Sequence, residues 1–318
     1  KTIEKKKTRW KRRMSEMLRA IKTDEFKGVN GCYTLNNGVK IPCVGFGTYK
    51  AAQDESERVI KTAIEAGYRC FDTASFYGTE PYLGTAIKES KIPREEFFIS
   101  SKAWKTEMGY SQVKEAFERT LENLQTDYLD LYLIHWPLPE VGYKDWKQLN
   151  IDTWRGMEEL YKEGKVKAIG VCNYLPHHLD NLIENCEIVP AVDQIEVHPG
   201  YTQESVLAYC KEHGILVQAW SPIGRMRMMS EPLIVELAEK YKVSPVQICL
   251  RYEVQRGILP LPKSSALERM KQNMDLFDFE ISREDMWRIT TLPQIGWSGE
   301  HPDRIRVKVV ESTEPYEA

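Results

Sequence analysis

The sequence predicts an α/β protein that folds as a (β/α)8 TIM barrel with an N-terminal β-hairpin and extra helices. Between residues 44 and 263, eight short apolar runs alternate with segments of helical periodicity. This alternation is typical of a parallel sheet covered by helices, and eight such units favour closure into a barrel. An open dinucleotide-binding sheet is disfavoured, because Gly45-Phe-Gly47 lacks the third glycine of the usual Gly-x-Gly-x-x-Gly turn.

Each element is expected at a definite place in the chain. A hairpin is expected over residues 33–42, where Asn37-Gly38 separates two alternating apolar and polar runs. The expected barrel strands are 44–48, 70–73, 97–102, 129–135, 168–173, 192–197, 216–221 and 257–263. The expected helices are 55–66, 80–89, 111–124, 152–163, 176–185, 203–213, 231–240 and 266–273, with further helices at 243–256 and 282–292.

Charge is distributed unevenly along the chain. Residues 1–28 hold eleven Lys and Arg against four Asp and Glu, so the rest carries a net charge of −10 although the whole chain has −3. We expect residues 1–28 to form a basic arm that is disordered or partly helical, and residues 29–318 to form a single barrel domain. The acidic body argues against a nucleic-acid partner.

Composition also restricts the cellular setting. No apolar run approaches the roughly 18 residues that a membrane helix needs. Seven cysteines are scattered without a Cys-x-x-Cys pair, which favours reduced thiols. We therefore expect a cytoplasmic protein, acting as a monomer. No metal site is expected, since the adjacent His177 and His178 point in two directions and no carboxylate stands at ligand spacing in the sequence.

Chemically active side chains cluster at the predicted strand ends, where barrels carry their chemistry. Asp72, Lys102 and His135 close the second, third and fourth strands, and Tyr77 follows Asp72 by five residues. Read singly, each has an ordinary explanation: Asp72 as a helix cap, Lys102 as a solvated charge, His135 as a satisfied rim residue. Together they place an acid, a phenol, an ammonium and an imidazole on one face.

Seven motifs in order give the chain a resemblance to the aldo-keto reductases, over about residues 30–300. They are Val44-Gly-Phe-Gly-Thr48, Phe71-Asp-Thr-Ala-Ser-Phe-Tyr-Gly78, Ser100-Ser-Lys-Ala-Trp104, Tyr132-Leu-Ile-His-Trp-Pro137, Ile169-Gly-Val-Cys-Asn173, Trp220-Ser-Pro-Ile-Gly224 and Pro260-Leu-Pro-Lys-Ser264. Within that family the sequence is most similar to the bacterial diketogluconate-reductase and prostaglandin-F-synthase-like group.

The resemblance implies NADPH-dependent reduction of aldehydes or ketones, with a small carbonyl compound as substrate. Tyr77 would donate the proton, and Lys102 would lower the pKa of its phenol. Asp72 would hold Lys102 and keep it charged, while His135 would orient the carbonyl oxygen. Tyr49, Phe76, Trp104 and His135 would contact the substrate.

The resemblance also implies a set of cofactor contacts. Trp220 would stack on the nicotinamide, and two cations with a hydroxyl at the far end favour NADPH over NADH. The complete set is Thr48, Tyr49, Asp72, Asn173, Gln194, Trp220, Ser221, Pro222, Ile223, Gly224, Lys263, Ser264, Arg269 and Asn273.

Two departures from the family pattern bear on the site. Cys172 stands where Ser is usual, which weakens one contact to the carboxamide. The loop 225–230 is short and unusual, and Arg225 and Arg227 are candidates to touch the pyrophosphate or an acidic substrate. Two other functions stay open at this point: a non-catalytic NADPH-binding protein, and an aldolase that forms a Schiff base at Lys102.

Overall fold

The computed structural model describes residues 31–50, 55–139 and 145–304. The expected basic arm of residues 1–28 lies outside this part of the chain. Eight parallel strands form one sheet in the order of the sequence. Their bounds are β3 (Phe46–Gly47), β4 (Cys70–Asp72), β5 (Phe98–Ala103), β6 (Leu131–Ile134), β7 (Ile169–Cys172), β8 (Val192–Glu196), β9 (Leu216–Trp220) and β10 (Leu259–Pro260). All eight expected strands are therefore confirmed; seven are shorter than predicted, and β5 keeps its length but begins one residue later.

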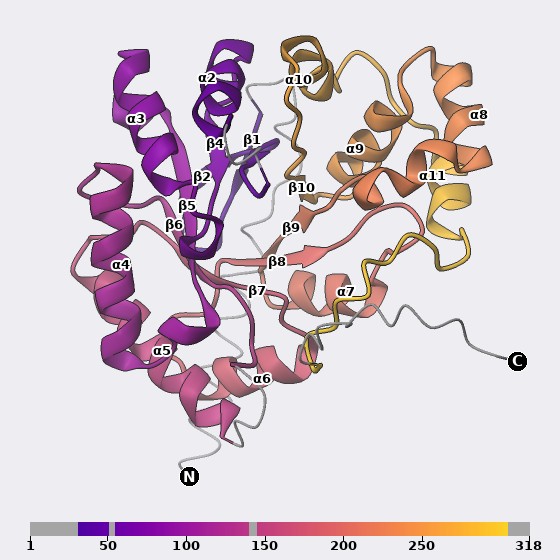
Figure 1. Ribbon diagram of the computed structural model, residues 1–318. Helices are drawn as coiled ribbons and strands as arrows, with labels where there is room; N and C mark the ends of the chain where they lie inside the picture. Colours follow the sequence, from indigo (N-terminus) through magenta and orange to yellow (C-terminus); the bar gives the residue numbers. More distant parts are fainter. Residues whose placement is uncertain (1–30, 51–54, 140–144, 305–318) are drawn as a thin grey trace, which may run out of the picture.

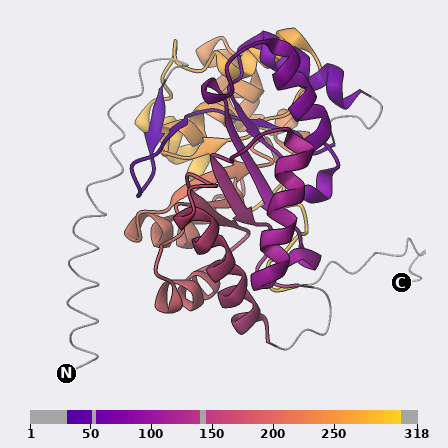
Figure 2. The same cartoon turned by 90° about the vertical axis from the view of Figure 1, so that its left-hand side faces the viewer.

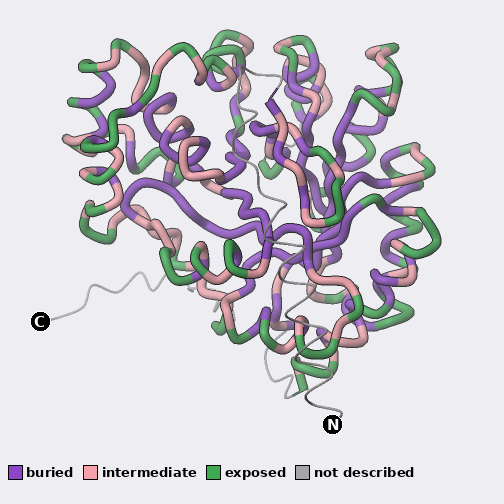
Figure 3. Tube along the Cα trace, turned by 180° about the vertical axis from the view of Figure 1, so that it is seen from behind, coloured by how far each residue is buried: buried purple, intermediate pink, exposed green. Residues whose placement is uncertain are grey.

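Helices surround the strands in sequence order (Figure 1). They are α2 (Ser56–Ala66), α3 (Glu80–Ser90), α4 (Tyr110–Leu124), α5 (Trp146–Lys162), α6 (Pro176–Asn185), α7 (Glu204–Glu212), α8 (Pro232–Tyr241), α9 (Pro245–Gln255), α10 (Leu267–Met274) and α11 (Arg283–Thr290). Neighbouring helices pack against one another from α2 to α7, and α10 packs back against α2. Figure 3 shows the buried strands at the centre and the exposed residues on the outer sides of the helices.

The first and last strands meet and close the barrel. The N–H group of Gly45 donates to the carbonyl of Pro260, and that of Gly47 to the carbonyl of Pro262, each at 3.1 Å. A Cβ atom at Gly45 would lie 2.6 Å from Cδ2 of Leu261. These glycines therefore allow the two strands to approach closely, which explains why they occur without a dinucleotide-binding turn.

The predicted hairpin is confirmed as β1 (Cys32–Thr34) and β2 (Lys40–Pro42), paired antiparallel. It covers the end of the barrel where the strands begin. Tyr33 donates its hydroxyl to the carbonyl of Ile258 at 3.0 Å, Asn36 donates to Pro190 at 3.0 Å, and Asn37 donates to Lys167 at 2.9 Å. Figure 2 shows the hairpin at the edge of the molecule, so the opposite end of the barrel stays open.

Helix α5 begins six residues before the predicted start at 152. The side chain of Asp145 accepts a hydrogen bond from the backbone N–H of Gln148, which caps the helix. Asn150 in the second turn is fully buried and donates to the carbonyl of Pro137 at 2.6 Å. A buried polar residue interrupts the apolar periodicity, so the pattern alone placed the start too late.

Residues after α11 return across the open end of the barrel, and we call residues 293–304 the C-terminal strap. Figure 1 shows this yellow segment running from α11 toward α6. The N–H group of Ile295 donates to the carbonyl of Gly200 at 2.9 Å, and Ser298 donates from its backbone and its hydroxyl to Glu196 at 2.9 and 2.6 Å. Among the residues described, no helix has both the length and the apolar character to span a membrane.

Candidate active site

A buried ion pair lies at the open end of neighbouring strands β4 and β5. Lys102 is fully buried, and its Nζ atom lies 2.6 Å from Oδ2 of Asp72 and 2.9 Å from the carbonyl oxygen of Thr73. The other carboxylate oxygen of Asp72 accepts from Ser100 Oγ at 2.9 Å and from Gln194 Nε2 at 2.8 Å. Hydrogen bonds to both partners offset part of the cost of burying the charges.

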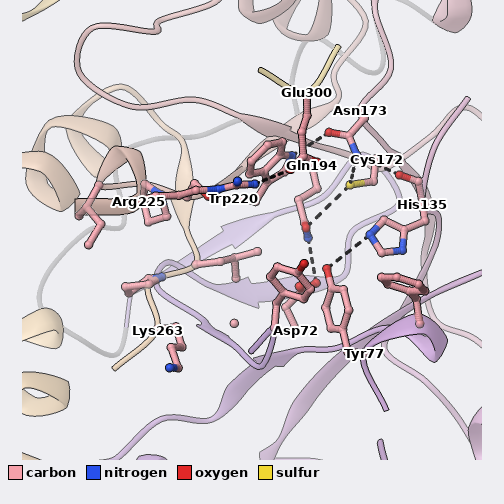
Figure 4. A pocket seen from close by; sticks show the side chains of 18 of the residues that line it. Asp72, Tyr77, His135, Cys172, Asn173, Gln194, Trp220, Arg225, Lys263 and Glu300 are labelled. Carbon is pink, nitrogen blue, oxygen red and sulfur yellow. Dashed lines mark hydrogen bonds and ion pairs between the residues drawn. The ribbon is translucent and has the colours of Figure 1, made fainter. Parts of the chain in front are cut away.

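Tyr77 brings a phenol to this ion pair. It ends the short 3-10 helix η1 (Ser75–Tyr77), and Gly78 follows at a φ of 66°, a conformation that glycine adopts readily. The turn directs the hydroxyl of Tyr77 to 3.3 Å from Lys102 Nζ and 3.4 Å from His135 Nε2. The structure thus brings the four predicted catalytic side chains together, and Figure 4 shows three of them, Asp72, Tyr77 and His135.

The pKa of Tyr77 departs from expectation. The sequence reading predicted that Lys102 would lower it, but burial raises the pKa of this phenol well above its usual value, and the nearby charge of Asp72 raises it further. The net shift is therefore upward, with burial as its largest cause, while stabilisation of the phenolate by Lys102 stays a prediction. The phenol therefore keeps its proton at neutral pH, which is the state that a proton donor needs.

His135 is held as a neutral imidazole. Burial lowers its pKa well below the usual value, and the charges of Lys102 and Lys105 lower it further. Its Nδ1 atom is buried and has no hydrogen-bond partner among the described residues. A buried acceptor without a partner is more common than a buried N–H without one. This favours the tautomer in which Nε2 carries the hydrogen and faces Tyr77, where it can donate to a bound oxygen.

Aromatic rings form one wall beside these polar groups. The rings of Phe76 and Trp104 stack with centroids 3.8 Å apart, and Trp104 meets His135 edge-on at 4.9 Å. The ring of Tyr49 lies 4.9 Å from that of Tyr77, and the two planes are tilted by 48°. Phe76 and Tyr49 are 51% and 40% exposed, so this wall faces the opening and suits contact with a substrate.

These side chains line a cavity of about 430 Å³, within the usual range of ligand sites. The indole of Trp220 borders the cavity and donates from Nε1 to Oδ1 of Asn173 at 2.7 Å. Asn173 and Ser221 have φ values of 64° and 52°. Such left-handed backbone is unfavourable for residues other than glycine and is frequent at functional sites.

The predicted cofactor contacts fall into two groups. Those that line the cavity are Tyr49, Asp72, Asn173, Gln194, Trp220, Ser221, Pro222, Ile223 and Lys263. Thr48 is buried behind Asp72 and donates to its carbonyl oxygen at 3.1 Å. Gly224 is packed against the ring of His198. Ser264, Arg269 and Asn273 follow the exposed Lys263, with Arg269 Nε at 3.3 Å from Ser264 Oγ.

A model of the Aldo/keto reductase family matches residues 43–293. The chain belongs to this family. Glyoxal reductase of Bacillus subtilis (strain 168) is 44% identical over 272 residues, which cover 85% of this chain and 96% of that protein. The 9,11-endoperoxide prostaglandin H2 reductase of Trypanosoma cruzi (strain CL Brener) is 41% identical over 276 residues, which cover 86% and 95%.

Solved structures agree with these relatives. An aldo-keto reductase of Bombyx mori, in complex with NADP, superimposes with a TM-score of 0.77 at 36% identity, covering 83% of this chain and 92% of that chain. The predicted fold and family are therefore confirmed, and with them the class of enzyme, an aldo-keto reductase.

The two arginines of the loop after β9 contact the C-terminal strap in this aldo-keto reductase. Arg225 forms an ion pair with Glu300 at 2.6 Å. Arg227 donates to the carbonyl oxygens of Gly296 and Trp297 at 3.0 and 3.2 Å. The sequence reading had considered a phosphate or an acidic substrate as their partner, and it did not foresee the strap.

Glu107 also contributes to the site, although no sequence motif singled it out. Its carboxylate accepts from the backbone N–H of Trp104 at 2.8 Å and from the hydroxyl of Ser75 at 2.6 Å. It therefore ties the turn that carries Tyr77 to the loop that carries Trp104. A glutamate three residues beyond Trp104 was the available signal, since that spacing is typical of a capping contact.

A carboxylate does approach the two adjacent histidines of α6, contrary to the sequence reading. Asp303 lies 3.0 Å from His177 Nε2 and 2.8 Å from His178 Nε2. However, Nδ1 of His178 accepts from the backbone N–H of Leu175 at 3.0 Å, so in the neutral ring Nε2 carries the hydrogen. A nitrogen that carries a hydrogen cannot bind a metal, and the absence of a metal stays our prediction.

Proposed function

We propose that this protein reduces aldehydes or ketones to alcohols, with NADPH as the source of hydride and Tyr77 as the source of the proton. The observation that carries the proposal is the position of the Tyr77 hydroxyl, between the Lys102 ammonium and the neutral His135 imidazole, at the base of a cavity. Carbonyl reduction needs a proton at oxygen when hydride reaches carbon. A buried, protonated phenol beside a cation can supply it.

The proton path follows from these distances. A carbonyl oxygen placed against Tyr77 and His135 accepts from the phenol and from Nε2–H, which polarises the C=O bond. When bound, the reduced nicotinamide supplies the hydride. The proton then passes from Tyr77 to the substrate oxygen, and the phenolate that remains is stabilised by Lys102 Nζ at 3.3 Å. Water returns the proton to the phenolate after release of the alcohol.

The cavity suits a nicotinamide dinucleotide phosphate. The flat indole of Trp220 offers a surface for the nicotinamide ring, and Asn173 and Gln194 offer amides to its carboxamide. At the other end, Lys263, Ser264 and Arg269 supply two cations and a hydroxyl. That set fits a phosphate dianion better than a bare ribose diol, which supports NADPH rather than NADH. Thr48, Gly224 and Asn273 would act from outside the cavity lining.

The aldolase alternative is weaker in this geometry. A Schiff base needs a neutral amine with a free lone pair. The Nζ atom of Lys102 donates to Asp72, Thr73 and Tyr77 at 2.6, 2.9 and 3.3 Å, so the group is held by three hydrogen bonds and is not directed at a substrate carbon. A non-catalytic NADPH-binding role is also disfavoured, since all four side chains of the proposed chemistry are present and in contact.

The test is a panel of aldehydes and ketones with purified protein and either NADPH or NADH. We expect loss of the absorbance of reduced nicotinamide with NADPH and a smaller kcat/KM with NADH. Glyoxal belongs in the panel, because a relative is named as a glyoxal reductase. Borohydride trapping of a substrate adduct on Lys102, without oxidation of NADPH, would support the aldolase instead. We propose that the protein is cytoplasmic and monomeric. Size-exclusion chromatography tests the monomeric state.

A further inference from the structure

An ion pair borders the cavity between two segments that are far apart in the sequence. Arg225 comes from the 3-10 segment η4 (Gly224–Ser230), and Glu300 comes from the C-terminal strap. The Nη2 atom of Arg225 lies 2.6 Å from Oε1 of Glu300. Both residues line the cavity. Figure 4 shows Arg225 beside Trp220, with Glu300 extending toward the site from above.

The strap fixes the position of Glu300. Ser298 is bound to the buried carboxylate of Glu196 through two hydrogen bonds, of 2.9 and 2.6 Å. Trp297 donates from its ring to the carbonyl of Glu300 at 3.3 Å. The side chain of Glu300 is only 17% exposed. It is therefore held in the site and is not a freely moving surface acid.

Arg225 is held in a defined place too. Its φ of 52° is a conformation that costs energy for a residue other than glycine. Its guanidinium lies 5.8 Å from the centre of the Trp220 ring, within range of a cation–π contact. The guanidinium of Arg225 therefore lies at the cavity beside Trp220, where it contacts the carboxylate of Glu300.

The charges of the cavity are therefore largely paired. Lys102 is bound by Asp72 at 2.6 Å and Arg225 by Glu300 at 2.6 Å, while Lys263 lies at the proposed phosphate end. Burial chiefly raises the pKa of Tyr77 and of the neighbouring Cys172, and the negative charge of Glu300 adds a small contribution in the same direction. An anion that enters near Trp220 meets a cation already occupied by a carboxylate.

We propose that Glu300 masks Arg225 and so lowers the affinity of the active site for anionic groups beside Trp220. This inference rests on the proposed function. The anionic oxygens that compete for Arg225 come from one of two sources, a carboxylate on the substrate or the pyrophosphate of the dinucleotide. Glu300 is then a specificity-determining residue. It makes the enzyme prefer uncharged carbonyl compounds, or it weakens the binding of the dinucleotide.

The experiment compares Glu300→Gln with the wild-type chain in two arms. The first arm measures kcat/KM for 4-carboxybenzaldehyde and for benzaldehyde at saturating NADPH. The ratio of the first value to the second is compared between the two proteins. The second measures the Kd of NADPH without substrate, from quenching of tryptophan fluorescence. Glutamine keeps the size of the side chain but removes the charge, so Arg225 is freed. We expect roughly a tenfold gain in one arm, since a charge-assisted hydrogen bond contributes about that much.

The arms identify the source of the anion. A gain in the ratio of kcat/KM assigns Arg225 to a substrate carboxylate, and a fall in the Kd assigns it to the dinucleotide. No change in either arm overturns the proposal. The matched control is Glu118→Gln on α4, outside the cavity lining. It removes an equal charge from the ion pair with Lys165 and should leave both quantities unchanged.

The double variant Arg225→Gln/Glu300→Gln separates masking from simple repulsion. If Glu300 acts by occupying Arg225, the gain disappears when the arginine is also removed. A gain that survives in the double variant overturns the proposal, because Glu300 would then act by direct repulsion. Failure of the proposed function is a separate result: the wild-type chain would oxidise no NADPH with any carbonyl, while the Kd arm would still report on Glu300.

Discussion

The hydroxyl of Tyr77 lies 3.3 Å from the ammonium of Lys102, although the same ammonium is bound by Asp72 at 2.6 Å. The cation is thus shared between a carboxylate that is always present and a phenol that becomes charged only during turnover. Lys102 therefore stabilises the phenolate only when proton transfer forms it. An interaction that is stronger in the transition state than in the ground state accelerates the reaction.

Tyr77→Phe removes the proton donor and leaves the ring. We expect kcat to fall by at least about a hundredfold, since general-acid catalysis contributes about that much or more. The Kd of NADPH should stay close to the wild-type value, because the ring remains between Tyr49 and His135. Stopped-flow turnover and fluorescence titration measure the two quantities. A variant that retains wild-type kcat would show that another group supplies the proton.

The pH dependence of reduction tests the two pKa shifts together. The donor must be protonated, and the pKa of Tyr77 is raised well above its usual value, so it keeps its proton through the alkaline range. The pKa of His135 is lowered well below its usual value, so the imidazole stays neutral in weak acid. We expect kcat/KM for reduction to be nearly constant from about pH 6 to about pH 9.

The opposite direction supplies the control. Oxidation of an alcohol needs the phenolate, so its rate should rise with pH over the same range. The raised pKa of the phenol would be contradicted if kcat/KM for reduction changed with a midpoint near neutral pH in the wild-type chain and this change were absent in Tyr77→Phe.

Removing the charge of Asp72 should destabilise the fold as well as the chemistry. Asp72→Asn leaves the fully buried ammonium of Lys102 without its carboxylate, and breaking such a pair costs about 3–5 kcal/mol. Urea unfolding measures this loss. The double variant Asp72→Asn/Lys102→Met removes both charges and should regain much of the stability while remaining inactive. Equal free energies of unfolding for the single and the double variant would show that the unpaired charge of Lys102 is not what destabilises Asp72→Asn.

Much of the site was predictable because parallel strands end at one edge. Asp72 ends β4, Lys102 is the penultimate residue of β5 and His135 follows β6, so the order of the strands places them together. The glycines of the first strand were also recognisable, although their role is to let the barrel close.

The remaining features depend on contacts that no local pattern shows. Glu300 reaches the cavity only because Ser298 of the strap binds Glu196, which precedes Ser298 by 102 residues. Asp303 meets the histidines of α6 by the same route. The direction of the pKa shift of Tyr77 depends on burial and on the nearby charge of Asp72, and the sequence alone shows neither. Sequence reasoning therefore found the groups and their edge of the barrel, but not the balance of charges among them.

The buried His178 should make the protein less stable in weak acid. Burial lowers its pKa from 6.5 to about 4, and the neighbouring His177 lowers it as well. Between these two pH values the unfolded chain binds a proton that the folded chain excludes. Stability is therefore fully present above the unfolded pKa and falls as the pH decreases through this window. At about 1.4 kcal/mol per pKa unit, the loss amounts to about 3 kcal/mol.

Urea unfolding of the wild-type chain and of His178→Asn, at several pH values across this window, measures the effect. The asparagine oxygen can still accept from the N–H of Leu175, as Nδ1 of His178 does at 3.0 Å, but it does not titrate. We expect the variant to lose less stability than the wild-type chain as the pH falls, whatever its stability near neutral pH. Parallel pH dependences in the two proteins would mean that His178 is not the group that the unfolded chain protonates.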